Sequence, residues 1–150
     1  RWRAGSDLAG VSLSVETAAG ASVVARLGRG EDAIEVTAAI HEGRAALRLE
    51  PPSPRPWSPD DPHLYRLEIE LLDANGATID AASQRIGLRT FAVAGAELHL
   101  NGAPIQLKGF GKHEESPLHG RGLNLPQLVK DFHLLRWIGA NSVRTSHYPY

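Results

Sequence analysis

Short runs of alternating apolar and polar residues, separated by turn-forming residues, are the feature that most restricts the fold of this chain. A β-strand presents successive side chains to opposite faces of a sheet, so each run predicts a strand with one buried face. Several short strands at roughly ten-residue spacing favour an all-β sandwich. The runs cover residues 11–15, 23–27, 34–38, 45–49 and 65–71.

Turn chemistry between the runs supports the same architecture. The proline-rich segment 51–56 lacks the amide donors that a sheet interior needs, so it predicts a connection outside the sheets. Asn75-Gly76 predicts a hairpin turn that leads into a returning strand over 79–93. A further hairpin is expected around 101–104, with 98–100 paired against 105–107.

Beyond residue 105 the apolar period changes. Apolar residues fall at three- and four-residue steps over 126–138, which predicts a helix with Pro126 in its first turn and Gly139 after its end. Strands are expected on either side, over 106–111 and 141–146. Together these elements predict a βαβ unit, which needs further parallel strands beside it to bury its apolar faces. We place residues 1–95 in the sandwich and 96–150 in a linking hairpin and the start of a second domain.

Composition removes several classes of function. The chain has no cysteine, which excludes disulfides, cysteine zinc sites and a thiolate nucleophile. The formal net charge is −1 and no basic cluster occurs, so a nucleic-acid partner is not expected. No long apolar run or signal sequence is present, so we expect no membrane span. The compartment is undecided, with a weak lean toward the cytoplasm.

Four stretches of the sequence together resemble glycoside hydrolase family 2, which includes β-glucuronidases and β-galactosidases. The stretches are Trp57–Tyr65, Arg85–Thr90, Gly109–Glu114 and Trp137–Tyr150. The last two are more similar to the β-glucuronidases of the family, whereas Ser116–Gly120 resembles its β-galactosidases.

This resemblance implies an immunoglobulin-like β-sandwich followed by the first βαβ of a (β/α)8 TIM barrel, truncated at Tyr150. It implies a fragment of a retaining glycoside hydrolase, most similar to β-glucuronidase, that cleaves a carbohydrate β-glycoside without a cofactor or metal. Such enzymes use one glutamate as acid/base and another as nucleophile. Both match positions beyond Tyr150, so we expect the fragment to be inactive alone and the parent protein to form a homo-oligomer.

The resemblance also assigns three residues of this chain. His113 and His147, 34 residues apart, match the two family histidines that line the sugar pocket. Arg144 matches an arginine that keeps the nucleophilic glutamate ionised, and a nearby cation lowers the pKa of a carboxyl in this way. TIM-barrel active sites lie at the carboxyl ends of the strands, where the two histidines are expected, and Arg144 is expected on the second strand.

Other interpretations of the same residues stay open. Glu114 and Glu115 are adjacent carboxylates, but neighbours after a strand usually point in different directions, which argues against an acid/base pair. The stretch His113–Pro117 lacks the second histidine of a zinc-binding H-E-x-x-H motif. Trp57 and Tyr65 could stack on a sugar, although anchoring of the sandwich core is favoured. The chain could also be a β-galactosidase fragment or a non-catalytic β-sandwich module that binds glycans.

Overall fold

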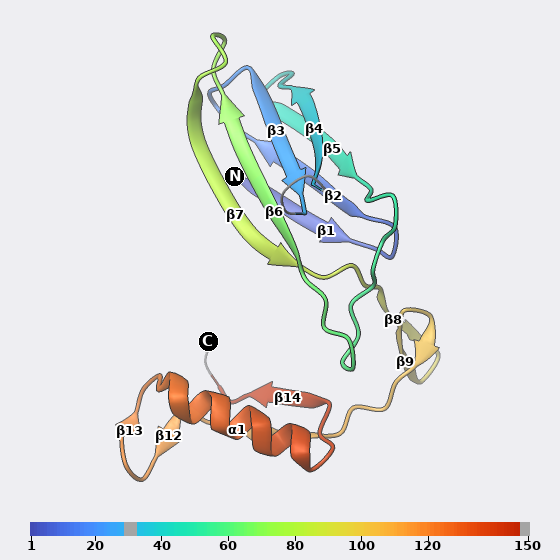
Figure 1. Ribbon diagram of the computed structural model, residues 1–150, viewed down its shortest axis with the longest axis vertical. Coiled ribbons are helices and arrows are strands. Elements are labelled where there is room, and N and C mark those ends of the chain that lie inside the picture. The colour runs from blue at the N-terminus through green and yellow to red at the C-terminus, as the bar shows by residue number, and fades with distance from the viewer. Residues whose placement is uncertain (29–32, 148–150) are drawn as a thin grey trace. The chain divides into compact units, whose positions relative to one another are not determined.

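The computed structural model describes residues 1–28 and 33–147. The chain divides after Pro104 into two compact units, Arg1–Pro104 and Ile105–Tyr150. The regular elements described in the first unit are all strands, and the second unit contains the helix α1 (Figure 1).

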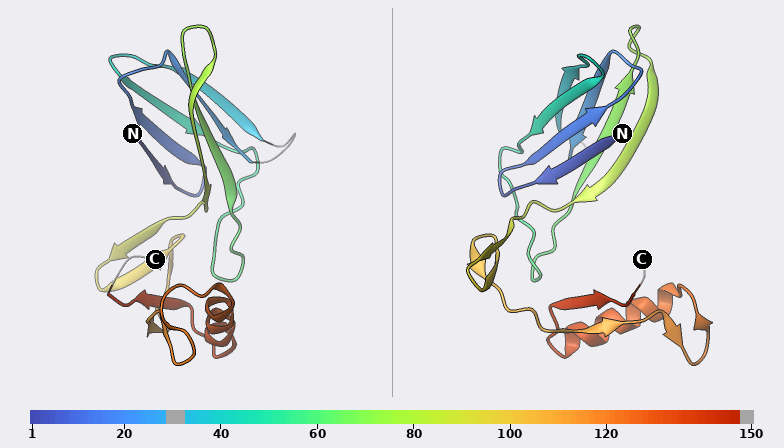
Figure 2. Two further views of the ribbon diagram at one scale, coloured as in Figure 1. Left: turned by 90° about the vertical axis from the view of Figure 1, so that its left-hand side faces the viewer. Right: turned by 180° about the vertical axis from the view of Figure 1, so that it is seen from behind.

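The first unit contains a β-sandwich of two antiparallel sheets, seen as two layers in Figures 1 and 2. One sheet has the order β1-β2-β5, in which β1 is Trp2–Ser6, β2 is Val11–Glu16 and β5 is Arg44–Leu49. The other has the order β4-β3-β6-β7, comprising Ile34–Ala39, Ser22–Leu27, Tyr65–Leu72 and Thr78–Ile86. The chain passes between the sheets after β2, β4 and β5, so strands distant in sequence become neighbours.

The alternating pattern of the sequence determines the sandwich core. In β2, positions 11, 13 and 15 are buried while positions 12, 14 and 16 are exposed. Leu27 and Leu67 lie opposite each other on β3 and β6, and both are almost completely buried. The inward faces of both sheets thus form one hydrophobic cluster: Val11, Leu13, Val15, Val23, Ala25, Leu27, Ala45, Leu47, Leu49, Leu67, Ile69 and Leu88.

Two details of the sandwich differ from the sequence-based expectation. The strand β1 was not expected, although it pairs with Val11–Val15 of β2. The single strand expected over 79–93 was wrong, because β7 ends at Ile86 and the next strand belongs to another sheet. Between them Gly87 lies against the Trp57 side chain, and Leu88 is fully buried and accepts a hydrogen bond from the Trp57 amide at 2.8 Å. Burial of Leu88 takes the chain out of the sheet.

A small antiparallel sheet follows, comprising β8 (Phe91–Ala94), β9 (Glu97–Leu100) and β10 (Ala103–Pro104). The expected turn is present, with Asn101 at φ 53° and Gly102 at φ 81°. The expected partner segment was wrong: β10 contributes only two residues, and β9 pairs mainly with β8. Asn101 accepts a hydrogen bond from the Thr90 amide at 3.1 Å and donates one to the Trp57 carbonyl at 2.9 Å, which joins this sheet to the sandwich.

The second unit contains the βαβ arrangement. The strands β11 (Gly109–Lys112) and β14 (Ser142–Thr145) are parallel, and α1 (Leu125–Trp137) connects them. Asn124 caps the helix by accepting a hydrogen bond from the Gln127 amide at 3.0 Å, and a proline occupies the first turn as expected. Gly139 at φ 79° follows the helix end. A short hairpin, β12 (Glu115–Ser116) and β13 (Gly120–Arg121), lies between β11 and α1.

The first strand of this unit begins later than expected because Asn141 binds the segment before it. The Asn141 side chain accepts a hydrogen bond from the Lys108 amide at 2.8 Å and donates one to the Gln106 carbonyl at 2.9 Å. Its backbone amide donates to the Lys108 carbonyl at 2.8 Å. These bonds hold 106–108 beside the start of β14 without a regular strand ladder.

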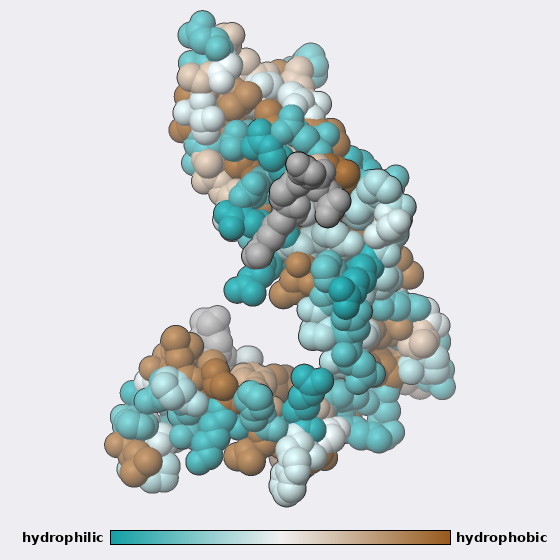
Figure 3. Space-filling model, in the orientation of Figure 1, coloured by the Kyte–Doolittle hydropathy of each residue, from teal (hydrophilic) through white to brown (hydrophobic). Residues whose placement is uncertain are grey.

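The two parallel strands do not close a barrel, and large apolar side chains of this unit are exposed. Trp137 is 82% exposed and Leu123 is 65% exposed, and α1 has no buried residue. Figure 3 shows apolar side chains, in brown, at the surface of this unit. Within the described residues, no helix has the length and apolar character needed to cross a membrane.

Candidate functional site

The carboxyl ends of β11 and β14 bring the two predicted pocket histidines together. Phe110 lies beside Val143 and Lys112 beside Thr145, so the strands end at the same edge of the sheet. His113 follows β11, and His147 follows β14 after one residue. Their rings lie with centroids 5.4 Å apart and planes at 76°, and both residues are exposed. An edge-to-face pair of imidazoles at the end of a parallel sheet offers several hydrogen-bonding groups to a polar ligand.

Arg144 lies on the opposite face of the sheet from the helix. Lys112 points toward α1, because it forms an ion pair with Asp131 of that helix. Gly111 precedes Lys112 and therefore faces the other way, and Arg144 is its register partner on β14. In a TIM barrel the face away from the helices lines the barrel interior. The Arg144 side chain is exposed and available to a carboxylate from another element.

The ion pair between Lys112 and Asp131 holds the helix to β11, the strand that precedes His113. The Lys112 Nζ lies 2.8 Å from an Asp131 carboxylate oxygen, with side chains only 17% and 24% exposed. Lys112 also donates to the His113 carbonyl at 2.8 Å, and Gln127 donates to Asp131 at 2.7 Å. The hydrogen bond from Lys112 is the main cause that lowers the pKa of Asp131, against partial desolvation that raises it. These bonds hold the end of β11, next to His113, against α1.

The residue before His147 was not identified by sequence reasoning. Among the described residues, Ser146 is the only buried polar side chain, at 2% exposure, and its amide donates to the Lys112 carbonyl at 3.0 Å. His147 then takes a left-handed backbone with φ 90°. A serine that follows a strand carries no signal of burial in its own sequence, so only the packing reveals it.

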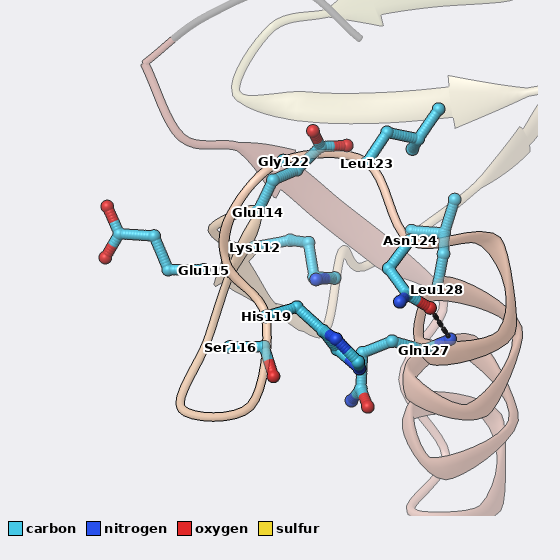
Figure 4. Close-up of a pocket in the computed structure, with 10 residues that line it drawn as sticks. All are labelled: Lys112, Glu114, Glu115, Ser116, His119, Gly122, Leu123, Asn124, Gln127 and Leu128. Atoms are coloured by element: carbon cyan, nitrogen blue, oxygen red, sulfur yellow. Dashed lines mark hydrogen bonds between the residues drawn. The ribbon is translucent and has the colours of Figure 1, made fainter.

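The hairpin of β12 and β13 forms a small pocket with the start of α1, shown in Figure 4. The pocket holds about 20 Å³, which is room for a water molecule rather than a sugar. In Figure 4 the side chains of Glu114 and Glu115 point in different directions, and Glu115 points away from the pocket. The two adjacent carboxylates therefore do not form an acid/base pair in this arrangement. Over 1–28 and 33–147, no group of three or more His, Cys, Asp or Glu side chains is placed to hold a metal ion.

The two aromatic residues considered for sugar stacking make contacts within the first unit. The Arg89 guanidinium lies 4.7 Å from the centroid of the Trp57 ring, and Gly87 packs against the same side chain. Tyr65 packs against the core, and its hydroxyl accepts a hydrogen bond from the Arg55 amide at 2.8 Å. Tyr65 thus packs against the core as the core-anchoring interpretation expects, whereas the contacts of Trp57 are with Gly87 and Arg89 beside the core.

Comparison with known families agrees with this arrangement of a sandwich followed by parallel strands. The model described as "Glycosyl hydrolases family 2" matches residues 6–89, and the one described as "Glycosyl hydrolases family 2, TIM barrel domain" matches residues 91–150. The chain belongs to glycoside hydrolase family 2. The two matches cover almost the whole chain, so the βαβ unit is the start of the family's barrel domain, and the family resemblance is confirmed.

Several curated β-glucuronidases are similar to the chain. A β-glucuronidase of Paenibacillus borealis is 50% identical over 96 residues, which are 64% of this chain and 16% of that protein. The β-glucuronidase of Mus musculus is 44% identical over 108 residues, which are 69% of this chain and 16% of that protein. The chain therefore spans about a sixth of the length of these relatives.

Solved structures of β-glucuronidases are also similar to the chain. The β-glucuronidase of Ruminococcus gnavus in complex with D-glucuronic acid has a TM-score of 0.78 and 32% identity, covering 99% of this chain and 26% of that one. A β-glucuronidase of Lactobacillus rhamnosus has the same TM-score and 38% identity, covering 99% and 25%. Residues 148–150, at the end of the stretch used for the family resemblance, lie outside the described residues.

Proposed function

We propose that this chain is one part of a retaining β-glucuronidase and supplies one side of its sugar pocket. The observation that carries the proposal is the pairing of His113 and His147, 5.4 Å apart, at the carboxyl ends of adjacent parallel strands. The similarity to β-glucuronidases over most of the chain supports this substrate class. The chain covers 16% of those relatives, which supports a longer parent enzyme.

Within the pocket, the two histidines donate and accept hydrogen bonds with the sugar hydroxyl and carboxylate groups. Imidazole can do both at once, because one ring nitrogen carries a proton and the other does not. Their rings are held against each other, which limits the orientations that either can take. Placement of a ligand by groups that are already oriented reduces the entropy lost on binding.

Arg144 has the second role in this proposal. Retaining hydrolysis needs a nucleophilic carboxylate that is ionised when it attacks the sugar, about 5–5.5 Å from the acid/base carboxyl. Arg144 faces the barrel interior and lowers the pKa of that nucleophile by stabilising its charged form. Both glutamates would come from barrel strands outside residues 1–150, so we expect no turnover by this chain alone.

The sandwich is proposed to be immunoglobulin-like. Its seven strands follow a Greek-key path, and β4 pairs with β3 rather than with β5. A fourth strand on that sheet is an addition known from immunoglobulin-like variable domains. The parent is proposed to be a homo-oligomer that acts on β-glucuronides, with residues 96–150 as the link to and start of its catalytic domain.

The test is a hydrolysis assay on the full-length parent with chromogenic β-glucuronide and β-galactoside. We expect a kcat/KM at least about tenfold higher for the glucuronide, since a site that hydrogen-bonds a substrate group rejects analogues lacking it. Preference for the galactoside would contradict the substrate assignment and favour the β-galactosidase alternative. Turnover by residues 1–150 alone would contradict the placement of both catalytic carboxylates elsewhere.

A further inference from the structure

Gly111 and Ser146 occupy adjoining places on the sheet face that carries Arg144. Gly111 has no side chain, and a Cβ atom built there would lie 3.1 Å from the Ser146 hydroxyl oxygen. This is shorter than an ordinary van der Waals contact between carbon and oxygen. Ser146 is 2% exposed. The space that a side chain at position 111 would need is therefore already used by the serine.

Burial of Ser146 bears directly on the next residue. The Ser146 amide extends the parallel ladder by its 3.0 Å hydrogen bond to the Lys112 carbonyl. His147 follows at φ 90°, a conformation that is unfavourable for residues other than glycine and persists only where neighbouring structure enforces it. Its ring then lies against that of His113, the residue after Lys112. Ser146, held by its burial and its backbone hydrogen bond, therefore directly precedes the strained residue His147.

We propose that Gly111 and Ser146 are positioning residues for the His113–His147 pair. Because position 111 has no side chain, the Ser146 side chain can pack closely against the backbone there. The buried Ser146 holds the backbone that turns His147 into the left-handed conformation and brings its ring to His113. The catalytic consequence of this arrangement rests on the proposed function, whereas the positioning itself does not.

Gly111 is a suitable place for a test because its backbone tolerates a side chain. Its φ angle lies outside the left-handed region, so Gly111→Ala adds a methyl group without backbone strain. The methyl group displaces Ser146 by a few tenths of an ångström, because packed interiors have little room to absorb an added carbon. Removing the hydroxyl by Ser146→Ala takes away the atom that the methyl group meets. The two substitutions should therefore compensate each other.

The first measurement is the proximity of the two imidazole rings in the 150-residue chain, by NOE cross-peaks between ring protons of His113 and His147. We expect Gly111→Ala to weaken the cross-peaks at least about twofold, since the NOE falls steeply with distance and the packed site has no spare room for the added carbon. The double variant Gly111→Ala/Ser146→Ala should restore them. Gly5→Ala is the matched control, because Gly5 is also a strand glycine with ordinary φ and no atom within 4 Å of its Cβ position.

The NOE experiment has outcomes that support the positioning inference and outcomes that overturn it. Unchanged cross-peaks in Gly111→Ala, or a loss that Ser146→Ala does not reverse, would overturn the positioning inference. If Gly111→Ala alone unfolds the second unit, the double variant decides: recovered folding and recovered cross-peaks support the inference, and failure to recover overturns it. The α1 amide resonances report whether the unit is folded in each variant.

The second measurement is kcat/KM of the full-length enzyme and of the same three variants for a chromogenic glucuronide. We expect a fall of roughly tenfold for Gly111→Ala and recovery in the double variant, because small displacements of binding groups have large kinetic effects. If the NOE responds as expected but kcat/KM does not, the positioning inference stands and the proposed role of the histidines in the sugar pocket fails. The positioning inference and the proposed function can thus be refuted independently of each other.

Discussion

Replacement of Leu67 by alanine tests how much burial in the sandwich core contributes to the stability of the first unit. Leu67 is 0% exposed and lies in the central strand β6, opposite Leu27 of β3 and Gln84 of β7. Truncation removes three buried carbon groups, worth about 2.4 kcal/mol at about 0.8 kcal/mol each. The cavity left behind adds to this, and Leu→Ala changes in packed cores typically cost about 2–5 kcal/mol. We therefore expect the free energy of unfolding to fall by about 3–4 kcal/mol.

Urea denaturation followed by tryptophan fluorescence measures this change. Trp137 of α1 is 82% exposed, so Trp137→Phe provides a background in which fluorescence reports only Trp2 and Trp57 of the first unit. At an m-value of about 1.5 kcal/mol per molar urea, a loss of 3 kcal/mol lowers the midpoint by about 2 M. The same substitution at the 44% exposed Leu64 is the control and should cost under about 1 kcal/mol.

Two results would refute the reasoning. A loss below about 1 kcal/mol at Leu67 would mean that the sheets do not pack as tightly as the structure indicates. An equal loss for Leu67→Ala and Leu64→Ala would mean that burial in the sandwich does not determine the cost. An unchanged m-value is required for either comparison, because it shows that both variants unfold the same surface.

Three further predictions concern other parts of the molecule. Asn101→Ala should destabilise the sheet of 91–104 by about 1–3 kcal/mol because two hydrogen bonds are lost, and faster amide exchange in that sheet measures the change. Asn101→Gly keeps the left-handed turn and should therefore lose less stability. The hydrogen bond from Arg48 is the main cause that lowers the pKa of Asp7 to about 2. The ionised Asp7 therefore stabilises the fold above pH 3.8, and this stabilisation is lost as the pH falls toward 2. In Asp7→Asn the free energy of unfolding should no longer show this loss between pH 3.8 and 2, and a pH profile identical to that of the original chain would contradict the ion pair. In the full-length enzyme Arg144→Gln should lower kcat on the order of tenfold to hundredfold and raise the lower pKa of the pH–rate profile, with partial retention in Arg144→Lys; a profile that does not move would exclude an electrostatic role.

Much of the local structure follows from the sequence. Alternation over 11–15 determines both the strand and its buried face, and the same holds for 65–71. Asn101-Gly102 and Gly139 mark chain reversals because their backbones adopt positive φ. The helix was expected over 126–138 and occupies Leu125–Trp137, since its apolar period and its first-turn proline are local signals.

The motifs also predicted the family, and with it the location of the candidate site. His113 and His147 each follow a segment with strand character, and the carboxyl ends of neighbouring parallel strands lie at one edge of a sheet. The order of these segments along the chain is therefore enough to predict that the two histidines lie near each other. Their ring contact and the left-handed backbone of His147 depend on packing that no local pattern encodes.

What only the tertiary structure decided is which elements meet. Alternation shows that a strand has a buried face but does not name its neighbour, so the pairing of β4 with β3 and the departure of 87–90 from the sheet were not predictable. The burial of Ser146 against Gly111 is of the same kind, because it depends on two residues 35 positions apart that only the parallel register brings together. Local preferences act through the few residues of one turn or strand, whereas these contacts arise from the packing of surfaces that the chain folds from distant segments.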